Sequence, residues 1–346
     1  MVIKADFRSD TVTKPSPGML DAMMNAKVGD DVLGEDPTVQ QLENKLAEQF
    51  GMEEGLFCPS GTMTNQIAIK CHTQPMDEVI CDQRSHIYRY EAGGIAYHSL
   101  ASVRLLDGER GILTPDLIEP EINEENIHYP SSTLVVLENT VNRGGGACYT
   151  LEQIEQIHSL CNTKGLKLHL DGARIFNALI ATGDQAKGYG KYFDSISVCL
   201  SKGLGAPVGS VLLGSKEMIR KAVKIRKAFG GGMRQAGFLA AAGIYALDHN
   251  VARLATDHRH ALILADALAQ VNYVAAILPV VTNIIVFEVA KGFKATNIVK
   301  DLEARGIACS TTGPNTIRLV THLDISSELI EMTVQNIIHL YPSASK

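Results

Sequence analysis

The sequence predicts an α/β fold, in which helices cover a mainly parallel sheet, followed by a smaller α+β domain. Short apolar segments with the length of a buried strand occur at 78–82, 102–106, 133–138, 166–171, 195–200 and 208–214. Helical apolar spacing occurs between several of them, notably at 150–163 and 215–228. The 346 residues, 45% of them hydrophobic, suffice for one large domain and one smaller domain.

The remaining elements follow the chain in order. Helical spacing at 38–51 ends at Gly51, a residue suited to a helix C-terminus, and a second helix is expected at 60–72. After residue 250 the pattern changes to a long helix at 251–271, a strand at 283–290, a helix at 295–304, short strands near 307–311 and 316–320, and a last helix at 326–340. We therefore expect a large domain at 20–250 and a small domain at 251–346, with residues 1–19 packed beside the small domain.

Composition excludes several classes of protein. The net charge of −6 and the lack of a long basic run argue against binding to nucleic acid. Seven cysteines without a CxxC pair indicate reduced thiols in a cytoplasmic protein and no metal site. The most apolar stretch, 274–290, is interrupted by Pro279, Thr282 and Asn283, so we expect a buried strand rather than a membrane span. The first ten residues lack the apolar run of a signal peptide.

Two groups of opposite charge follow predicted strands. Asp171 ends the strand 166–171, and Lys202 follows the strand 195–200 in the glycine-rich sequence SVCLSKGLGAPVGS. Ligands of parallel sheets bind beyond the carboxyl ends of the strands, where a carboxylate needs a partner. Asp171 could instead cap the next helix. Because both residues have glycines beside them, we expect them to share one pocket.

A third feature is the helix start at Ser60-Gly61-Thr62. It offers backbone N–H groups, two hydroxyls and the positive end of a helix dipole, which suit a phosphate, although such starts also serve as simple caps. The chain lacks the GxxxxGK[ST] and GxGxxG nucleotide motifs. A lysine for a Schiff base, a carboxylate for a ring nitrogen and a phosphate site together predict pyridoxal 5′-phosphate (PLP). Apolar surroundings favour the neutral amine that a Schiff-base lysine requires.

A set of motifs in fixed order gives a more specific resemblance. It comprises DFRSDTVTKPSPGM, VGDDVLGEDPTVQQLE, PSGTMTNQIA, EAGGIA, LENTVNRGGG, LHLDGARIFNA, LSKGLGAPVGS, GGGMRQAG and TIRLVTHLD. With these motifs the chain resembles the low-specificity L-threonine aldolases, PLP-dependent enzymes of fold type I, the aspartate-aminotransferase-like group. The resemblance implies retro-aldol cleavage of L-threonine or L-allo-threonine to glycine and acetaldehyde. It also implies a homo-oligomer, usually a tetramer built as a pair of dimers.

The resemblance also implies roles around the cofactor. Lys202 would form the Schiff base and Asp171 would pair with the ring nitrogen. Arg174 would lie near the phenolic oxygen of the ring and contact the substrate. Ser60, Gly61 and Thr62 would hold the phosphate. Arg234 would reach the phosphate of the neighbouring subunit, so that a dimer shares its active sites.

Further roles concern the substrate. Ser9 and Arg318 would hold the substrate carboxylate, which the planar guanidinium can bind with two hydrogen bonds. His86 would stack on the cofactor ring, and His128 is a second candidate for a group beside the substrate hydroxyl. Whether one of these histidines or a water acts as the base stays open.

The chain departs from its relatives at two positions. Val141 stands where relatives often have histidine, and Leu33 stands where they often have tyrosine. These departures concern stereochemical preference and rate rather than reaction class. The alternative functions are another fold type I enzyme, either a β-eliminating lyase or an aminotransferase, and, outside this group, a non-catalytic binding module or a nicotinamide dehydrogenase.

Overall fold

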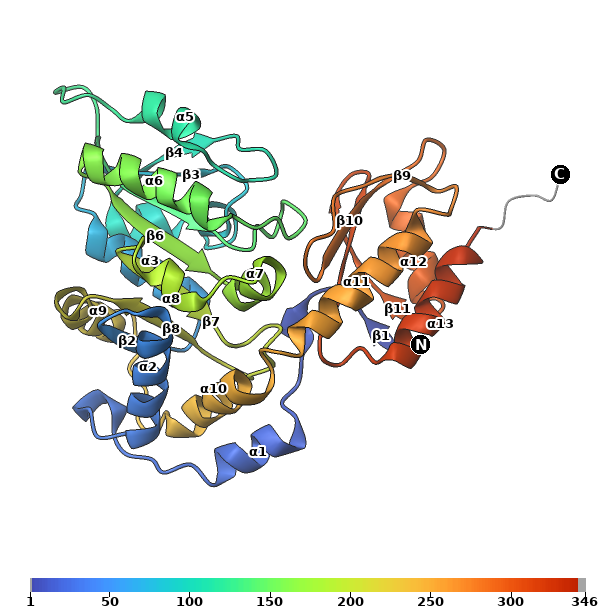
Figure 1. The fold of residues 1–346 in the computed structure, drawn as a ribbon, viewed down its shortest axis with the longest axis horizontal. Coiled ribbons are helices and arrows are strands. Elements are labelled where there is room, and N and C mark those ends of the chain that lie inside the picture. Colours follow the sequence, from blue (N-terminus) through green and yellow to red (C-terminus); the bar gives the residue numbers. More distant parts are fainter. Residues whose placement is uncertain (1, 342–346) are drawn as a thin grey trace.

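The computed structural model describes residues 2–341, and the larger part of this range is built on a seven-stranded mixed sheet (Figure 1). Its spatial order is β2–β8–β7–β6–β5–β3–β4. Strand β8 runs antiparallel to both neighbours and the other pairs are parallel. The strands are β2 (Glu54–Cys58), β3 (Asp77–Asp82), β4 (Ser102–Leu106), β5 (Ser131–Glu138), β6 (Lys167–Gly172), β7 (Ser195–Cys199) and β8 (Ser210–Gly214).

Helices pack on both faces of this sheet. Helices α3 and α9 contribute to one apolar cluster with Leu56 and Leu212, whereas α2, α6 and α8 contribute to the main core on the other face, with Phe57 and Leu170. The helices of this part are α1 (Pro17–Met24), α2 (Pro37–Phe50), α3 (Gly61–His72), α4 (His86–Arg89), α5 (Pro115–Ile118), α6 (Leu151–Lys164), α7 (Ile175–Thr182), α8 (Ala186–Gly190), α9 (Lys216–Ala228) and α10 (Gly237–His249). The predicted layered α/β architecture is confirmed.

The C-terminal part has its own sheet and apolar core. Its antiparallel sheet has the order β12–β13–β10–β9, with helices α11, α12 and α13 contributing to the core. The elements are α11 (Leu254–Leu268), β9 (Val274–Ile277), β10 (Ile284–Val289), α12 (Ala295–Glu303), β11 (Ile307–Ala308), β12 (Ser310–Gly313), β13 (Thr316–Val320) and α13 (Ser327–Ile338).

The N-terminal segment lies beside this smaller part. Strand β1 (Ala5–Asp6) pairs in parallel with β11 (Figure 1). Phe7 is buried in the apolar core of the small sheet. The chain then returns to the large sheet through α1. Ser9 and Asp10 are thereby placed between the two parts.

The topology positions polar residues at one edge of the large sheet. Glu138, Asp171 and Ser197 are neighbours in register on β5, β6 and β7. Because these strands are parallel, their carboxyl ends form a common edge, and Lys202 follows β7 by three residues. Across residues 2–341, we find no helix with the length and apolar character needed to cross a bilayer.

Candidate active site

A cavity of about 390 Å³ lies between this sheet edge and the small domain. Five residues predicted from the sequence line it: Ser9, His86, Arg174, Lys202 and Arg318. The other lining residues are Thr11, Tyr90, Glu138, Asn142, Arg143, Ala173, Ser310, Thr311 and Thr312. The cavity therefore combines the N-terminal segment, the large sheet edge and the strands β12 and β13.

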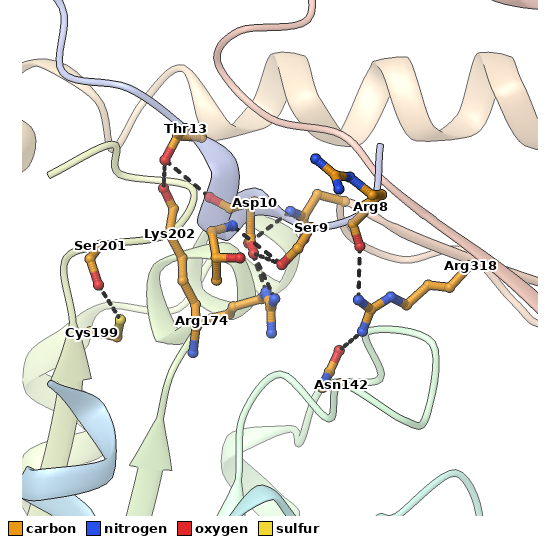
Figure 2. A network of polar contacts seen from close by, with 12 residues as sticks. Arg8, Ser9, Asp10, Thr13, Asn142, Arg174, Cys199, Ser201, Lys202 and Arg318 are labelled. Atoms are coloured by element: carbon orange, nitrogen blue, oxygen red, sulfur yellow. Dashed lines mark hydrogen bonds and ion pairs between the residues drawn. The ribbon is translucent and has the colours of Figure 1, made fainter. Parts of the chain in front are cut away.

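Lys202 enters the cavity from the loop after β7. Its backbone carbonyl accepts a hydrogen bond from Thr13 Oγ1 at 3.0 Å, which ties this loop to the N-terminal segment. Figure 2 shows its side chain extending beside that of Arg174. Among the residues that the structure describes, no carboxylate forms an ion pair with its ammonium group. The amine is thus available to a ligand.

Asp171 is a buried carboxylate that forms no ion pair with a described lysine or arginine. It is 3% exposed, and its oxygens accept hydrogen bonds from the Ala173 backbone N–H at 3.1 Å and from Asn65 Nδ2 at 3.0 Å. Within residues 2–341, no lysine or arginine forms an ion pair with it. A buried charge is costly unless it is paired. The site therefore suits a ligand with a cationic group at this point.

His86 lies next to Asp171 and is held by a buried glutamate that the sequence reasoning missed. Its Nδ1 is 2.9 Å from Glu91 Oε1, and ligand atoms of His86, Glu91 and Asp171 lie within 4.8 Å of one another. Burial disfavours the imidazolium, but the hydrogen bond with Glu91 and the charge of Asp171 outweigh it and raise the pKa of His86. His86 thus presents a partly exposed ring to the cavity on a fixed support.

Arg174 forms a buried ion pair with Asp10 of the N-terminal segment (Figure 2). Its Nε donates to Asp10 Oδ2 at 2.7 Å and its Nη2 donates to Oδ1 at 2.6 Å. Burial opposes ionisation of Asp10, but Arg174 outweighs it and holds the pKa of this carboxyl at about 2. The pair fixes the guanidinium in the cavity wall and attaches the N-terminal segment to it.

Arg318 approaches from β13 with one donor unsatisfied. Its Nη1 donates to Asn142 Oδ1 at 2.7 Å and its Nη2 donates to the Arg8 carbonyl at 2.9 Å (Figure 2). Its Nε is buried and forms no hydrogen bond to any described residue. Burial and the nearby charge of Arg174 lower the pKa of Arg318. An unpaired guanidinium beside the cavity suits an anionic ligand group such as a carboxylate.

Comparison with known proteins supports an assignment to a family. The sequence pattern of the beta-eliminating lyases matches residues 6–291. The chain is 44% identical to the probable low-specificity L-threonine aldolase 2 of Arabidopsis thaliana, over 94% of each chain. It is 43% identical to the low specificity L-threonine aldolase of Escherichia coli K12, over 93% of this chain and 95% of the relative.

The chain belongs to the low-specificity L-threonine aldolases.

Solved structures confirm fold type I. A threonine aldolase of Leishmania major superposes with a TM-score of 0.86 at 23% identity, covering 97% of this chain and 99% of that one. A structure of SPT with PLP superposes with a TM-score of 0.76 at 15% identity, covering 97% and 86%. At these identities the likeness shows the fold alone.

Not every residue that the threonine aldolase motifs indicated lines the cavity. Ser60 caps α3 by accepting from the Met63 backbone N–H at 3.2 Å, and Thr62 is exposed at the helix start. The side chain of Arg234 is 57% exposed and pairs with Asp30 at 2.8 Å. His128 is exposed on the loop before β5. None of these residues lines the cavity of its own chain, and their roles stay predictions.

The two positions expected to depart from the threonine aldolase motifs lie in different settings. Val141 is 1% exposed and contributes to the main core, whereas Leu33 is 68% exposed in a short 3-10 helix at Asp31–Leu33. Neither residue lines the cavity.

Glu138 is a carboxyl in the cavity lining that the sequence reasoning missed. It accepts hydrogen bonds from the backbone N–H groups of His86 at 2.7 Å and Asn142 at 2.9 Å. Burial and the neighbouring charge of Asp171 raise its pKa to about 7. The sequence carried a usable signal, because Glu138 ends a predicted strand in the same way as Asp171.

Proposed function

We propose that this chain is a PLP-dependent aldehyde-lyase that cleaves L-threonine and L-allo-threonine to glycine and acetaldehyde. Other β-hydroxy-α-amino acids would give glycine and the corresponding aldehyde. The observation that carries the proposal is one cavity lined by Lys202, with its available amine, and by Arg318, with an unsatisfied donor, while the buried carboxylate of Asp171 lies next to His86 of the same lining. The 44% identity to a probable L-threonine aldolase supports this reaction over a β-elimination or a transamination.

The residues present fit PLP. Lys202 would hold the cofactor aldehyde carbon, and Asp171 would pair with the protonated ring nitrogen, which supplies the cation that this buried carboxylate lacks. The start of α3, at Ser60, Gly61 and Thr62, would hold the phosphate. Bound PLP supplies an electron sink for the electron pair released when the Cα–Cβ bond breaks.

The remaining side chains act on the substrate. Arg318, with Ser9 beside it, binds the carboxylate and so fixes the direction of the Cα–Cβ bond. Cleavage requires that the β-hydroxyl lose its proton as the aldehyde forms and that Cα later gain one. His86 and Glu138 both line the cavity, the pKa of His86 is raised by Glu91 and Asp171, and that of Glu138 is raised to about 7. Either of them, or a water that they hold, serves as the proton acceptor.

Product analysis tests the reaction. Purified enzyme incubated with L-threonine or L-allo-threonine should release acetaldehyde and glycine in equal amounts. Lys202→Ala should lose the absorption of bound cofactor and fast turnover, whereas Lys191→Ala, at an exposed surface site, should behave as wild type. Release of ammonia and a keto acid from these substrates would refute the aldolase assignment.

We further propose a dimer that shares its active sites, in which Arg234 serves the neighbouring subunit. Arg234 is exposed and lies outside the cavity lining of its own chain, and large apolar side chains such as Leu33 and Phe238 are exposed on nearby segments. A tetramer would be a pair of such dimers.

Mixed dimers test the shared site. Lys202→Ala and Arg234→Ala subunits with different tags are co-expressed, and the heterodimer is purified through both tags. If Arg234 acts on the neighbouring subunit, one of its two sites is intact and it should have about half of the wild-type activity. An inactive heterodimer would show that Arg234 acts within its own chain, and an Arg234→Ala homodimer with wild-type activity would show that Arg234 has no role at either site.

A further inference from the structure

A row of polar side chains lies buried between helix α3 and the large sheet. The neighbouring contacts of this helix are apolar, through Ile67, Ala68 and Ile69. At the row itself, β6 and β7 present His169, Asp171, Ser195 and Ser197, all 3% exposed or less. Buried polar groups are costly unless each finds a partner. Packing alone therefore does not account for the burial of these polar side chains.

Hydrogen bonds join this row into a chain that ends at Asp171. His72 Nε2 is 2.8 Å from Ser195 Oγ, which is 2.8 Å from His169 Nδ1. His169 Nε2 is 3.2 Å from Asn65 Oδ1, and Asn65 Nδ2 donates to Asp171 Oδ2 at 3.0 Å. At its far end His72 lines a second cavity with Lys167 and Asp194, near the amino ends of β6 and β7.

The direction of each hydrogen bond in this row follows from the carboxylate of Asp171 at its end. Asn65 Nδ2 lies 3.0 Å from both Asp171 Oδ2 and Glu91 Oε1, so the amide must turn its two hydrogens toward these oxygens. Asn65 Oδ1 then faces His169 and can only accept, which places the proton of His169 on Nε2. Nδ1 of His169 is consequently unprotonated, so the Ser195 hydroxyl at 2.8 Å donates to it, and the Ser195 carbonyl, 3.1 Å from the same nitrogen, receives no hydrogen from it.

The two histidines do not add charge to the row. Burial lowers the pKa of His169 to about 3 and that of His72 to about 4. Both rings are therefore neutral near neutral pH, and each carries a single N–H. An amide does not pass a proton on as an imidazole does, so the chain orients groups rather than conducting protons.

We propose that Asn65 is a positioning residue that orients Asp171 and, through Glu91, the ring of His86, and that His169 and Ser195 hold Asn65 in place. One amide thereby links the carboxylate that pairs with the cofactor ring to the imidazole that lies beside that ring. The role of Asp171 in this proposal rests on the function proposed above. The hydrogen-bond pattern itself does not, which allows the two to be tested separately.

Nitrogen NMR of histidine-labelled protein tests the pattern in the unmodified chain. His169 should appear as the Nε2–H form, with Nδ1 unprotonated, and should not titrate between about pH 5 and about pH 9. An Nδ1–H form, or titration near the ordinary histidine pKa, would overturn the proposal whether or not the protein cleaves threonine.

Cofactor affinity tests the consequence for the site. Asn65→Leu and His169→Leu should weaken PLP binding by about 10-fold to 100-fold, because each removes support from a hydrogen bond to a carboxylate. His169→Gln keeps a donor toward Asn65 and should stay within about 3-fold of wild type. Ser197→Ala is the matched control, since the Ser197 hydroxyl has Thr64 as its single hydrogen-bond partner among residues 2–341, and Thr64 retains the Gly61 carbonyl as a partner.

The outcomes separate the two proposals. Wild-type affinity in both leucine variants, or equal losses in His169→Gln and His169→Leu, would overturn the positioning role. If the affinities follow the expected order while L-threonine is not cleaved, the positioning role stands and the proposed reaction fails. Circular dichroism of each variant identifies one that does not fold, and for it the NMR result on the unmodified chain decides.

Discussion

Replacing Asp10 with asparagine should destabilise the protein strongly, because it leaves a buried guanidinium without its counter-charge. The side chains of Asp10 and Arg174 are 0% and 5% exposed and share two short hydrogen bonds. Removing one partner of a buried ion pair typically costs about 3–5 kcal/mol. We expect Asp10→Asn to reduce the free energy of unfolding by this amount.

The pH dependence gives a second measure of the same pair. The pKa of Asp10 is about 2 in the folded protein against an ordinary 3.8, which corresponds to about 2 kcal/mol of stability. Because this pKa is lowered, the contribution is present above pH 3.8 and is lost as the pH falls through about 2. The difference between wild type and Asp10→Asn should therefore shrink over this range.

Urea unfolding at fixed protein and cofactor concentrations measures both effects. Asp6→Asn provides a control, since Asp6 pairs with the largely exposed Arg8 and such pairs contribute about 1 kcal/mol or less. A loss in Asp10→Asn no larger than that in Asp6→Asn would refute the reasoning.

Three further predictions concern single residues. Arg318→Lys should raise KM for threonine about 10-fold or more through loss of the planar donor set, while Arg8→Lys should not change it. In cofactor-free protein, Glu138→Gln should make the free energy of unfolding less dependent on pH. The raised pKa of Glu138 gives wild type a contribution to stability that is present below pH 4.5 and is lost as the pH rises through about 7. Gly146→Ala, whose Cβ would lie 2.2 Å from Thr282 Oγ1, should lower the melting temperature more than Gly183→Ala, where the added Cβ meets nothing within 4 Å.

The sequence predicted the elements whose signals are local. Helix α2 ends at Phe50 with Gly51 in a left-handed conformation, as the C-terminal glycine indicated, and the predicted strand 102–106 matches β4. Strand β2 was missed because Glu54 and Gly55 interrupt its apolar run. Its partner β8 was found, but only the three-dimensional pairing shows that it runs against its neighbours.

The residues of the site also differ in whether a local sequence pattern indicates them. Lys202 and Asp171 follow apolar strands, so a strand-end rule places them at one edge. Asp10 is 164 residues from Arg174 in sequence, and Asn65 is 106 residues from Asp171, so no local pattern connects these pairs. Glu138 lies between these cases, since the strand-end rule applied to β5 would have found it. His128 lies on an exposed loop outside the cavity lining, so its place beside the substrate hydroxyl stays a prediction.

The pairing of β1 with β11 has a consequence for biosynthesis. Residues 5 and 6 leave the ribosome long before their partners at 307 and 308 are made. The hydrogen bond from Arg318 to the Arg8 carbonyl likewise spans 310 residues. The substrate-binding wall of the cavity therefore cannot close on a nascent chain. A polypeptide released before Arg318 is made would lack this wall, so the first activity of each molecule reports that its synthesis has passed this point.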